Sequence, residues 1–188
     1  MNPISPTPKQ ATPLPDTKGQ GGDSVLRILS VLEDTTVDGP GFRTSIYCAG
    51  CTHHCPGCHN PQSWAPEGGH EMSVDELMQI IEADPFAPGV TFTGGDPMQQ
   101  AEAFTALAQA IRQRTRKNIW CYTGYRYEAL LDMPAQRRLL QLVDVLVDGP
   151  YVAAQRDTDL LFRGSANQRL IDVPRSLAQG CVVLWTRA

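Results

Sequence analysis

The sequence predicts an α/β fold in which βα units build a mainly parallel sheet. Short apolar runs alternate along the chain with stretches whose apolar residues recur at helical spacing. This alternation is typical of βα units, because parallel strands are joined by crossover helices. Several of the apolar runs end in glycine-containing turns, among them Gly94-Gly95-Asp96-Pro97 and Thr123-Gly124. We expect these turns to meet at one edge of the sheet, where parallel strands present ligand-binding loops.

Local patterns predict the individual elements in order. An apolar run over 25–32 and an alternating run over 43–48 predict two strands, separated by the turn sequence Asp38-Gly39-Pro40-Gly41. A helix begins after Ser73, because Ser73 and Glu76 form a capping-box pair ahead of an apolar helical pattern. The other predicted elements are strands at 90–93, 119–122 and 145–147, an amphipathic helix around 104–111, helical turns over 127–142 divided at Pro134, and further strands at 170–173 and 182–185.

The chain is long enough for one domain with a sizeable core, since it has 188 residues. Residues 1–23 are rich in proline, glycine, threonine and glutamine and show no periodicity. Such a segment buries too little apolar surface to offset its ordering entropy, which predicts a disordered tail. Residues 24–188 are predicted to form the single folded domain.

Composition and charge are those of an ordinary globular protein. Hydrophobic residues make up 41% and charged residues 19%, and the net charge of -4 gives no sign of a nucleic-acid partner. No apolar run approaches the roughly 20 residues of a membrane span, and no secretory signal is found. We therefore expect a cytoplasmic protein without a membrane partner. In that compartment clustered thiols are metal ligands more often than disulfides.

The most informative feature is a cysteine-rich loop. Four of the six cysteines lie between Cys48 and Cys58, and from Cys51 onward the spacing is C-x3-C-x2-C, with Cys55 in the middle. Thiolates are the usual ligands of iron–sulfur clusters. Three ligands for four irons leave one iron open, much as a catalytic zinc keeps an open position for substrate.

Three other interpretations of the loop stay open. A zinc site with help from nearby histidines is one, although zinc sites usually separate their cysteine pairs by about a dozen residues or more. An electron-carrying ferredoxin with Cys48 as fourth ligand is the second, although Cys48 ends an apolar strand and suits a buried position. A disulfide pair is the third. The remaining cysteines, Cys121 and Cys181, lie in apolar runs, which predicts buried thiols.

The loop and several further segments resemble the radical S-adenosylmethionine (SAM) superfamily, and within it the activating proteins of anaerobic ribonucleoside-triphosphate reductase. C-x3-C-x2-C is the superfamily's cluster motif, and the longer string from Gly50 to Asn60, with Trp64 beyond it, is similar to the activating family. Several motifs that occur in the same order as in a protein family identify that family better than one short motif does. Further matches occur in the family's order. Asp38-Gly39-Pro40-Gly41 and Arg43 precede the loop, and Thr93-Gly94-Gly95-Asp96-Pro97, Thr123-Gly124-Tyr125, 145–149 and 163–168 follow it.

The resemblance implies an incomplete, TIM-like barrel of mainly parallel βα units. It implies an oxidoreductase with one [4Fe-4S] cluster, which cleaves SAM reductively and generates a glycyl radical on an anaerobic ribonucleotide reductase. The implied partners are that reductase and an electron donor such as flavodoxin or ferredoxin. The alternative target is another glycyl-radical enzyme or a small molecule, and the alternative class is a non-catalytic iron–sulfur electron carrier.

The resemblance also assigns the site residues. It makes Cys51, Cys55 and Cys58 the metal ligands, with no other catalytic residue. It assigns SAM contacts to Gly57, Cys58, His59, Gly94, Gly95, Asp96 and Thr123.

The residue types at several of these positions suit a ligand site. Glycines allow close approach of a ligand to the backbone, and the Asp96 carboxylate suits an amino group. The structural alternative is a turn in which Asp96 is a helix N-cap and Pro97 is the first helical residue. The other loop histidines, His53 and His54, are expected to be solvated. Two later polar residues either hold the rim together or make ordinary surface contacts, namely Arg163 and Asn167.

Overall fold

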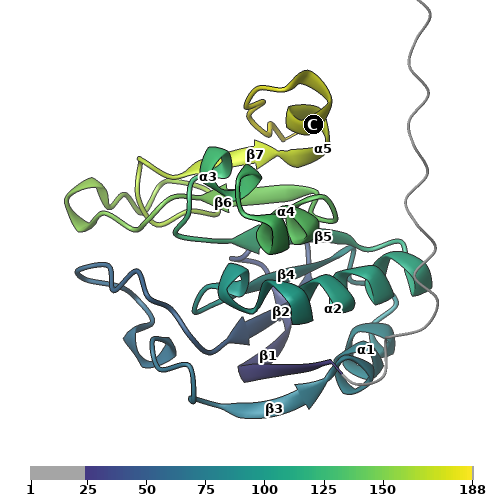
Figure 1. Ribbon diagram of the computed structural model, residues 1–188. Coiled ribbons are helices and arrows are strands. Elements are labelled where there is room, and N and C mark those ends of the chain that lie inside the picture. The colour runs from purple at the N-terminus through teal and green to yellow at the C-terminus, as the bar shows by residue number, and fades with distance from the viewer. Residues whose placement is uncertain (1–23, 188) are drawn as a thin grey trace, which may run out of the picture.

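A computed structural model describes residues 24–187, so the predicted tail at 1–23 lies outside the described residues. One seven-stranded sheet in the order β3-β1-β2-β4-β5-β6-β7 forms its centre (Figure 1). The strands are β1 (Val25–Thr35), β2 (Arg43–Cys48), β3 (His70–Ser73), β4 (Gly89–Gly94), β5 (Asn118–Tyr122), β6 (Val145–Asp148) and β7 (Arg169–Asp172).

The sheet is mixed, with a parallel centre. Strands β2, β4, β5 and β6 pair in parallel, whereas β1, β3 and β7 join through antiparallel pairs. The predicted α/β class with a parallel core is therefore confirmed. The central strands are almost entirely buried, as expected where both faces of a parallel sheet are covered. Cys48 pairs with Gly94, and Tyr122 pairs with Val147, so the carboxyl ends of the parallel strands share one edge.

Helices cover one face of the sheet (Figure 1). The capping box is confirmed, because the Ser73 hydroxyl accepts the Glu76 N–H at 3.2 Å and the Glu76 carboxylate accepts the Ser73 N–H at 2.7 Å. The predicted break at Pro134 is also confirmed, since a new helix starts there. The helices are α1 (Val74–Ala83), α2 (Ala101–Arg114), α3 (Tyr127–Leu131), α4 (Pro134–Leu140) and α5 (Val173–Gln179).

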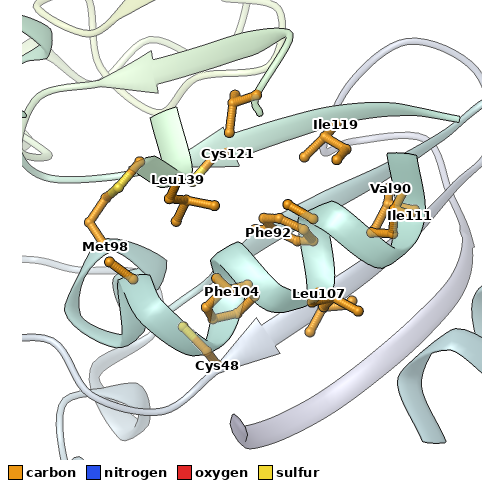
Figure 2. Close-up of a cluster of buried hydrophobic side chains, with 14 of the residues drawn as sticks. Cys48, Val90, Phe92, Met98, Phe104, Leu107, Ile111, Ile119, Cys121 and Leu139 are labelled. Atoms are coloured by element: carbon orange, nitrogen blue, oxygen red, sulfur yellow. The ribbon is translucent and has the colours of Figure 1, made fainter. Parts of the chain in front are cut away.

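The main core lies between these helices and the sheet (Figure 2). Helix α2 faces β4 across it, and the ring centroids of Phe92 and Phe104 are 4.8 Å apart. Burial of each such side chain stabilises the fold by about 1.5–3 kcal/mol. Cys48 and Cys121 lie in the same core with no exposed surface, which confirms that both are buried thiols.

Loops cover the opposite face. Trp120, Val145 and Val147 form a second apolar cluster there with Phe162 and Trp185. Both faces of the parallel strands are thereby shielded from water. The loops that follow the carboxyl ends of these strands lie at the edge of the sheet. Within residues 24–187, no helix combines the length and the apolar character needed to cross a membrane.

Two elements were not predicted, and two local predictions were wrong. The polar edge strand β3 and helix α5 were not predicted, although Asp172 accepts the Arg175 N–H as an N-cap of α5. The expected strand at 182–185 is reduced to one isolated bridge between Ile171 and Leu184. Because this last segment joins no strand ladder, Cys181 is exposed, and its predicted burial is wrong.

Candidate functional site

The cysteine loop leaves the carboxyl end of β2 and is closed by backbone hydrogen bonds. The Gly50 N–H donates to the Ser63 carbonyl at 2.8 Å, and the Cys51 N–H donates to the Trp64 carbonyl at 3.1 Å. Inside the loop, the Cys58 N–H donates to the Cys55 carbonyl at 3.0 Å. These bonds close the loop on itself at the edge of the sheet where the other parallel strands also end.

The thiols of the loop are free and accessible. Cys51, Cys55 and Cys58 are all half-buried, whereas Cys48 is completely buried. Burial raises the pKa of the Cys51 thiol; the His53 N–H lowers it, and negative charge on Asp96, Cys55 and Cys58 raises it. The Asn60 N–H donates to the Cys58 sulfur at 3.3 Å. Backbone donors directed at sulfur are among the features that tune iron–sulfur clusters.

This donor set fits a cluster better than a single ion. Among residues 24–187, no three cysteine, histidine, aspartate or glutamate side chains are placed to share one metal ion. The ligands of a four-iron cluster bind separate irons, so they need not converge on a single point. The loop offers three accessible thiols and a backbone donor to the Cys58 sulfur, and Cys48 is too deeply buried to join them.

The Gly94-Gly95 pair brings the end of β4 against the root of the cysteine loop. The Gly95 N–H donates to the Cys48 carbonyl at 2.7 Å, and the Asp96 N–H donates to the Gly50 carbonyl at 2.8 Å. A Cβ atom on Gly94 would lie 2.6 Å from the Cys48 nitrogen, and one on Gly95 would lie 2.4 Å from the Gly50 oxygen. Glycine is therefore required here by protein backbone, apart from any ligand.

Asp96 gathers donors from several segments. It is 1% exposed, and its carboxylate accepts hydrogen bonds from the Met98 N–H at 2.9 Å, the Thr123 hydroxyl at 2.9 Å and the Gly124 N–H at 3.0 Å. The bond to Met98 makes Asp96 the N-cap of the 3-10 helix Pro97–Gln100, which confirms the structural alternative. The Asp96 carboxylate and the Thr123 hydroxyl are thus engaged within the protein, and their predicted SAM contacts stay predictions.

His53 completes this arrangement and corrects one prediction. Its Nε2 lies 2.7 Å from an oxygen of Asp96, and its side chain is only 18% exposed, so the expected solvated state is wrong. Its ring makes a T-shaped contact with the Tyr125 ring at a centroid distance of 4.6 Å. His54 is exposed as predicted, although its ring contacts Trp64. No local pattern indicates the His53 contact, because Asp96 is 43 positions away.

The residues on either side of Cys58, Gly57 and His59, face the segment that contains Tyr151 and Ala153. Gly57 adopts a φ of +75°, and a Cβ there would contact Ala153 at 3.4 Å. The His59 ring lies 4.8 Å from that of Tyr151. His59 also lines an open cavity of about 470 Å³ together with residues that include Asp38. This places His59 between the cysteine loop and a space large enough for a ligand or a chain segment.

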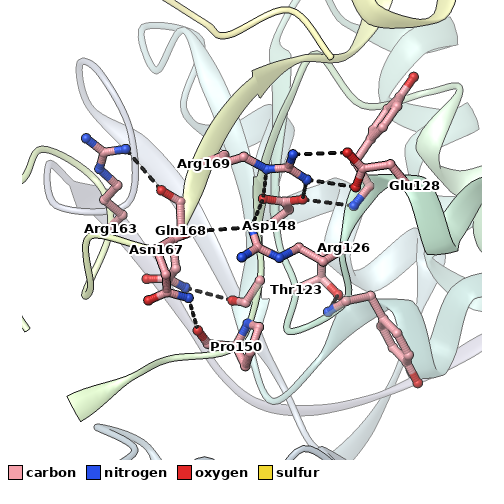
Figure 3. Close-up of polar contacts among 12 residues, drawn as sticks. Thr123, Arg126, Glu128, Asp148, Pro150, Arg163, Asn167, Gln168 and Arg169 are labelled. Carbon is pink, nitrogen blue, oxygen red and sulfur yellow. Dashed lines mark hydrogen bonds and ion pairs between the residues drawn. The ribbon is translucent and has the colours of Figure 1, made fainter. Parts of the chain in front are cut away.

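A polar network fixes the segment that carries Tyr151 (Figure 3). Asp148 is fully buried and is paired with Arg169, and the Tyr127 N–H donates to it at 2.8 Å. The predicted rim role is confirmed for Asn167, which bonds to the backbone of this segment, as Gln168 also does. Arg163 bonds only to Gln168, five positions along the chain, which is the ordinary local contact that was its alternative. The three bonds run from Asn167 to the Pro150 carbonyl at 2.8 Å, from Gln168 to the Gly149 carbonyl at 3.1 Å and from Arg163 to the Gln168 carbonyl at 3.0 Å.

Comparison with known proteins agrees with this geometry. The model of a family described as "4Fe-4S single cluster domain" matches residues 37–171. The anaerobic ribonucleoside-triphosphate reductase-activating protein of Vibrio cholerae is 38% identical over 139 residues, which cover 70% of this chain and 88% of that protein. Its namesake in Escherichia coli K12 is 37% identical, with coverage of 70% and 89%.

A more distant relative and one solved structure extend the comparison. The protein of the same name from enterobacteria phage T4 is 35% identical, with coverage of 71% of this chain and 86% of that protein. Among solved structures, QueE from Escherichia coli overlaps 54% of this chain and 53% of its own, with a TM-score of 0.45 and 16% identity. An overlap of that extent decides neither the fold nor the reaction.

Proposed function

Because this chain belongs to the family of anaerobic ribonucleoside-triphosphate reductase-activating proteins, we propose that it is the radical SAM activase of such a reductase. The observation that carries the proposal is the group of three free, half-buried thiols at the strand edge where the Gly94–Asp96 turn meets the loop. When bound and reduced, a [4Fe-4S] cluster supplies the electron that cleaves SAM, and the resulting 5′-deoxyadenosyl radical takes a hydrogen atom from a glycine of the reductase.

In this proposal each part of the site has a separate task. The cluster is held by Cys51, Cys55 and Cys58, and the residues proposed to contact SAM are Gly57, Cys58, His59, Gly94, Gly95, Asp96 and Thr123. Main-chain groups of the Gly94–Asp96 turn lie beside the loop, because no side chain separates them from it. The engaged carboxylate of Asp96 orients this turn through its bonds to neighbouring segments.

The fold supports the same proposal. We propose that the sheet is the incomplete barrel of the radical SAM type, since its helices lie on one face and its parallel strands end at one edge (Figure 1). The cavity beside His59, about 470 Å³, is open to solvent, which suits a glycine-bearing segment of a protein partner. The proposed electron donor is a flavodoxin or ferredoxin, and the proposed compartment is the cytoplasm, where thiols stay reduced.

The test requires the reductase of the same source organism. The reconstituted protein is reduced without oxygen, mixed with SAM and the reductase, and examined by electron paramagnetic resonance (EPR) spectroscopy. We expect a glycyl-radical doublet on the reductase and one 5′-deoxyadenosine for each radical formed. SAM cleavage without a protein radical would point to another target, and a cluster that is reduced without any SAM cleavage would point to an electron carrier.

A further inference from the structure

The contact between His53 and Asp96 joins the cysteine loop to two strand ends. His53 lies between Cys51 and Cys55 in the chain, and its Nε2 is 2.7 Å from the carboxylate oxygen Oδ2 of Asp96. The same oxygen accepts bonds from the Thr123 hydroxyl and the Gly124 N–H. One buried atom therefore collects donors from the loop and from the end of β5, while Asp96 itself follows β4.

The His53 ring is also held by packing. The Tyr125 ring packs against it in a T-shaped contact, and a Cβ on Gly124 would lie 2.4 Å from a carbon of the His53 ring, so that ring fills the space above the glycine. A hydrogen bond to a buried charge is stronger than one between neutral groups, and it loses little to solvent because Asp96 is 1% exposed. Together these contacts leave His53 in one position.

We infer that His53 is a positioning residue, which fixes the thiols of Cys51 and Cys55 relative to the Gly94–Asp96 turn and to Thr123. The inference rests on the proposed function, in which that turn and Thr123 hold SAM next to the cluster. In this role His53 acts through Asp96, to which its ring nitrogen is bonded. Electron transfer from the cluster to SAM depends on their relative placement. A loosened loop therefore weakens the binding of SAM beside the cluster before it lowers the amount of iron bound.

The experiment compares His53→Ala and His53→Gln with a matched control, His54→Asn. The side-chain amide of Gln offers a donor near the position of Nε2, so His53→Gln is the conservative variant. His54 is the adjacent histidine, is exposed and has a φ of +45°, a conformation that asparagine tolerates well. Iron content is measured after anaerobic reconstitution, and the EPR spectrum of the reduced cluster is then titrated with SAM.

We expect all three variants to bind iron as the wild type does. His53→Ala should require at least about tenfold more SAM for half of the spectral change, from the loss of one charge-assisted hydrogen bond. His53→Gln should recover most of this loss, and His54→Asn should titrate like the wild type.

Two results would overturn the inference while leaving the proposed function intact. One is a His53→Ala titration identical to that of the wild type. The other is loss of iron from both His53 variants with iron retained in His54→Asn, which would assign His53 to the cluster itself. A wild-type spectrum that does not respond to SAM would instead refute the proposed function, on which the inference rests.

Discussion

Replacing Gly95 by alanine tests how closely β4 and the cysteine loop approach one another. A Cβ at this position would lie 2.4 Å from the Gly50 oxygen, 2.9 Å from the Gly50 carbonyl carbon and 3.1 Å from the Cys48 oxygen. All three are backbone atoms, so no side-chain rotation relieves the clash. The turn and the loop must move apart for the alanine to fit.

The size of the effect follows from these contacts. Overpacking of a well-packed site costs about 1–3 kcal/mol. Separation also weakens the bond from the Gly95 N–H to Cys48, at 2.7 Å, and that from the Asp96 N–H to Gly50, at 2.8 Å, and each such bond contributes about 0.5–1.5 kcal/mol. We expect Gly95→Ala to lower the free energy of unfolding by about 2–4 kcal/mol, a large share of the roughly 5–15 kcal/mol of a typical domain.

The assay is urea unfolding of the metal-free protein, combined with iron analysis after reconstitution. Iron binding should also fall, because Gly50 directly precedes the first proposed ligand, Cys51. Gly180→Ala is the control, since Gly180 has a φ of +67° and a Cβ added there would meet no atom of residues 24–187 within 4 Å. That change should cost only the backbone strain of about 1–2 kcal/mol and leave iron binding unchanged.

One result would refute this reasoning. A Gly95→Ala protein with wild-type stability and wild-type iron content, impaired only in SAM binding, would show that the glycine serves the ligand alone. The close approach of Gly95 to the Gly50 backbone would then not be what requires a glycine.

Three further predictions concern the thiols and the rim. Cys48→Ala should keep its iron, because Cys48 is fully buried, whereas iron analysis should find none after alanine replacement at Cys51, Cys55 or Cys58; loss of iron from Cys48→Ala would indicate a fourth ligand. Asp148→Ala should lower the free energy of unfolding by roughly 2–4 kcal/mol in urea titration, because Asp148 is fully buried. The loss stays below that of a fully buried pair, since the partner Arg169 is 28% exposed. A change below about 1 kcal/mol would contradict this prediction. In the metal-free protein burial raises the pKa of Cys51, so less thiolate forms at a given pH. The alkylation rate of Cys51 should therefore reach its midpoint at a higher pH than that of a free cysteine peptide. An equal or lower midpoint would count against the raised pKa.

Much of the fold could be predicted because its signals are local. The capping box at Ser73 and the break at Pro134 each depend on residues within one or two helical turns. Strand β3 lacked such a signal, since it is short and polar and is defined by its pairing with β1. Helix α5 had a usable signal in Asp172 followed closely by Pro174, but the apolar residues beside it favoured a strand.

The site could be predicted only in part, for the same reason. The cysteine spacing and the Gly94–Asp96 turn are short motifs, so their residues were identified from sequence. The role of His53 depends on Asp96, and that of Asn167 depends on the Pro150 carbonyl 17 positions earlier. Contacts between distant segments leave no periodic pattern in the chain, and therefore only the folded structure reveals them.

The bonds around Asp96 also constrain the order of events during biosynthesis. His53 is synthesised well before its acceptor, and Thr123 follows that acceptor by 27 positions. Parallel strands pair slowly, because distant segments must first meet. The loop with its three thiols is therefore synthesised before the segments that hold His53 in place, and its contacts are complete only after β5 has joined the sheet. Until then the newly made chain carries the three thiols on a loop that lacks the contact between His53 and Asp96.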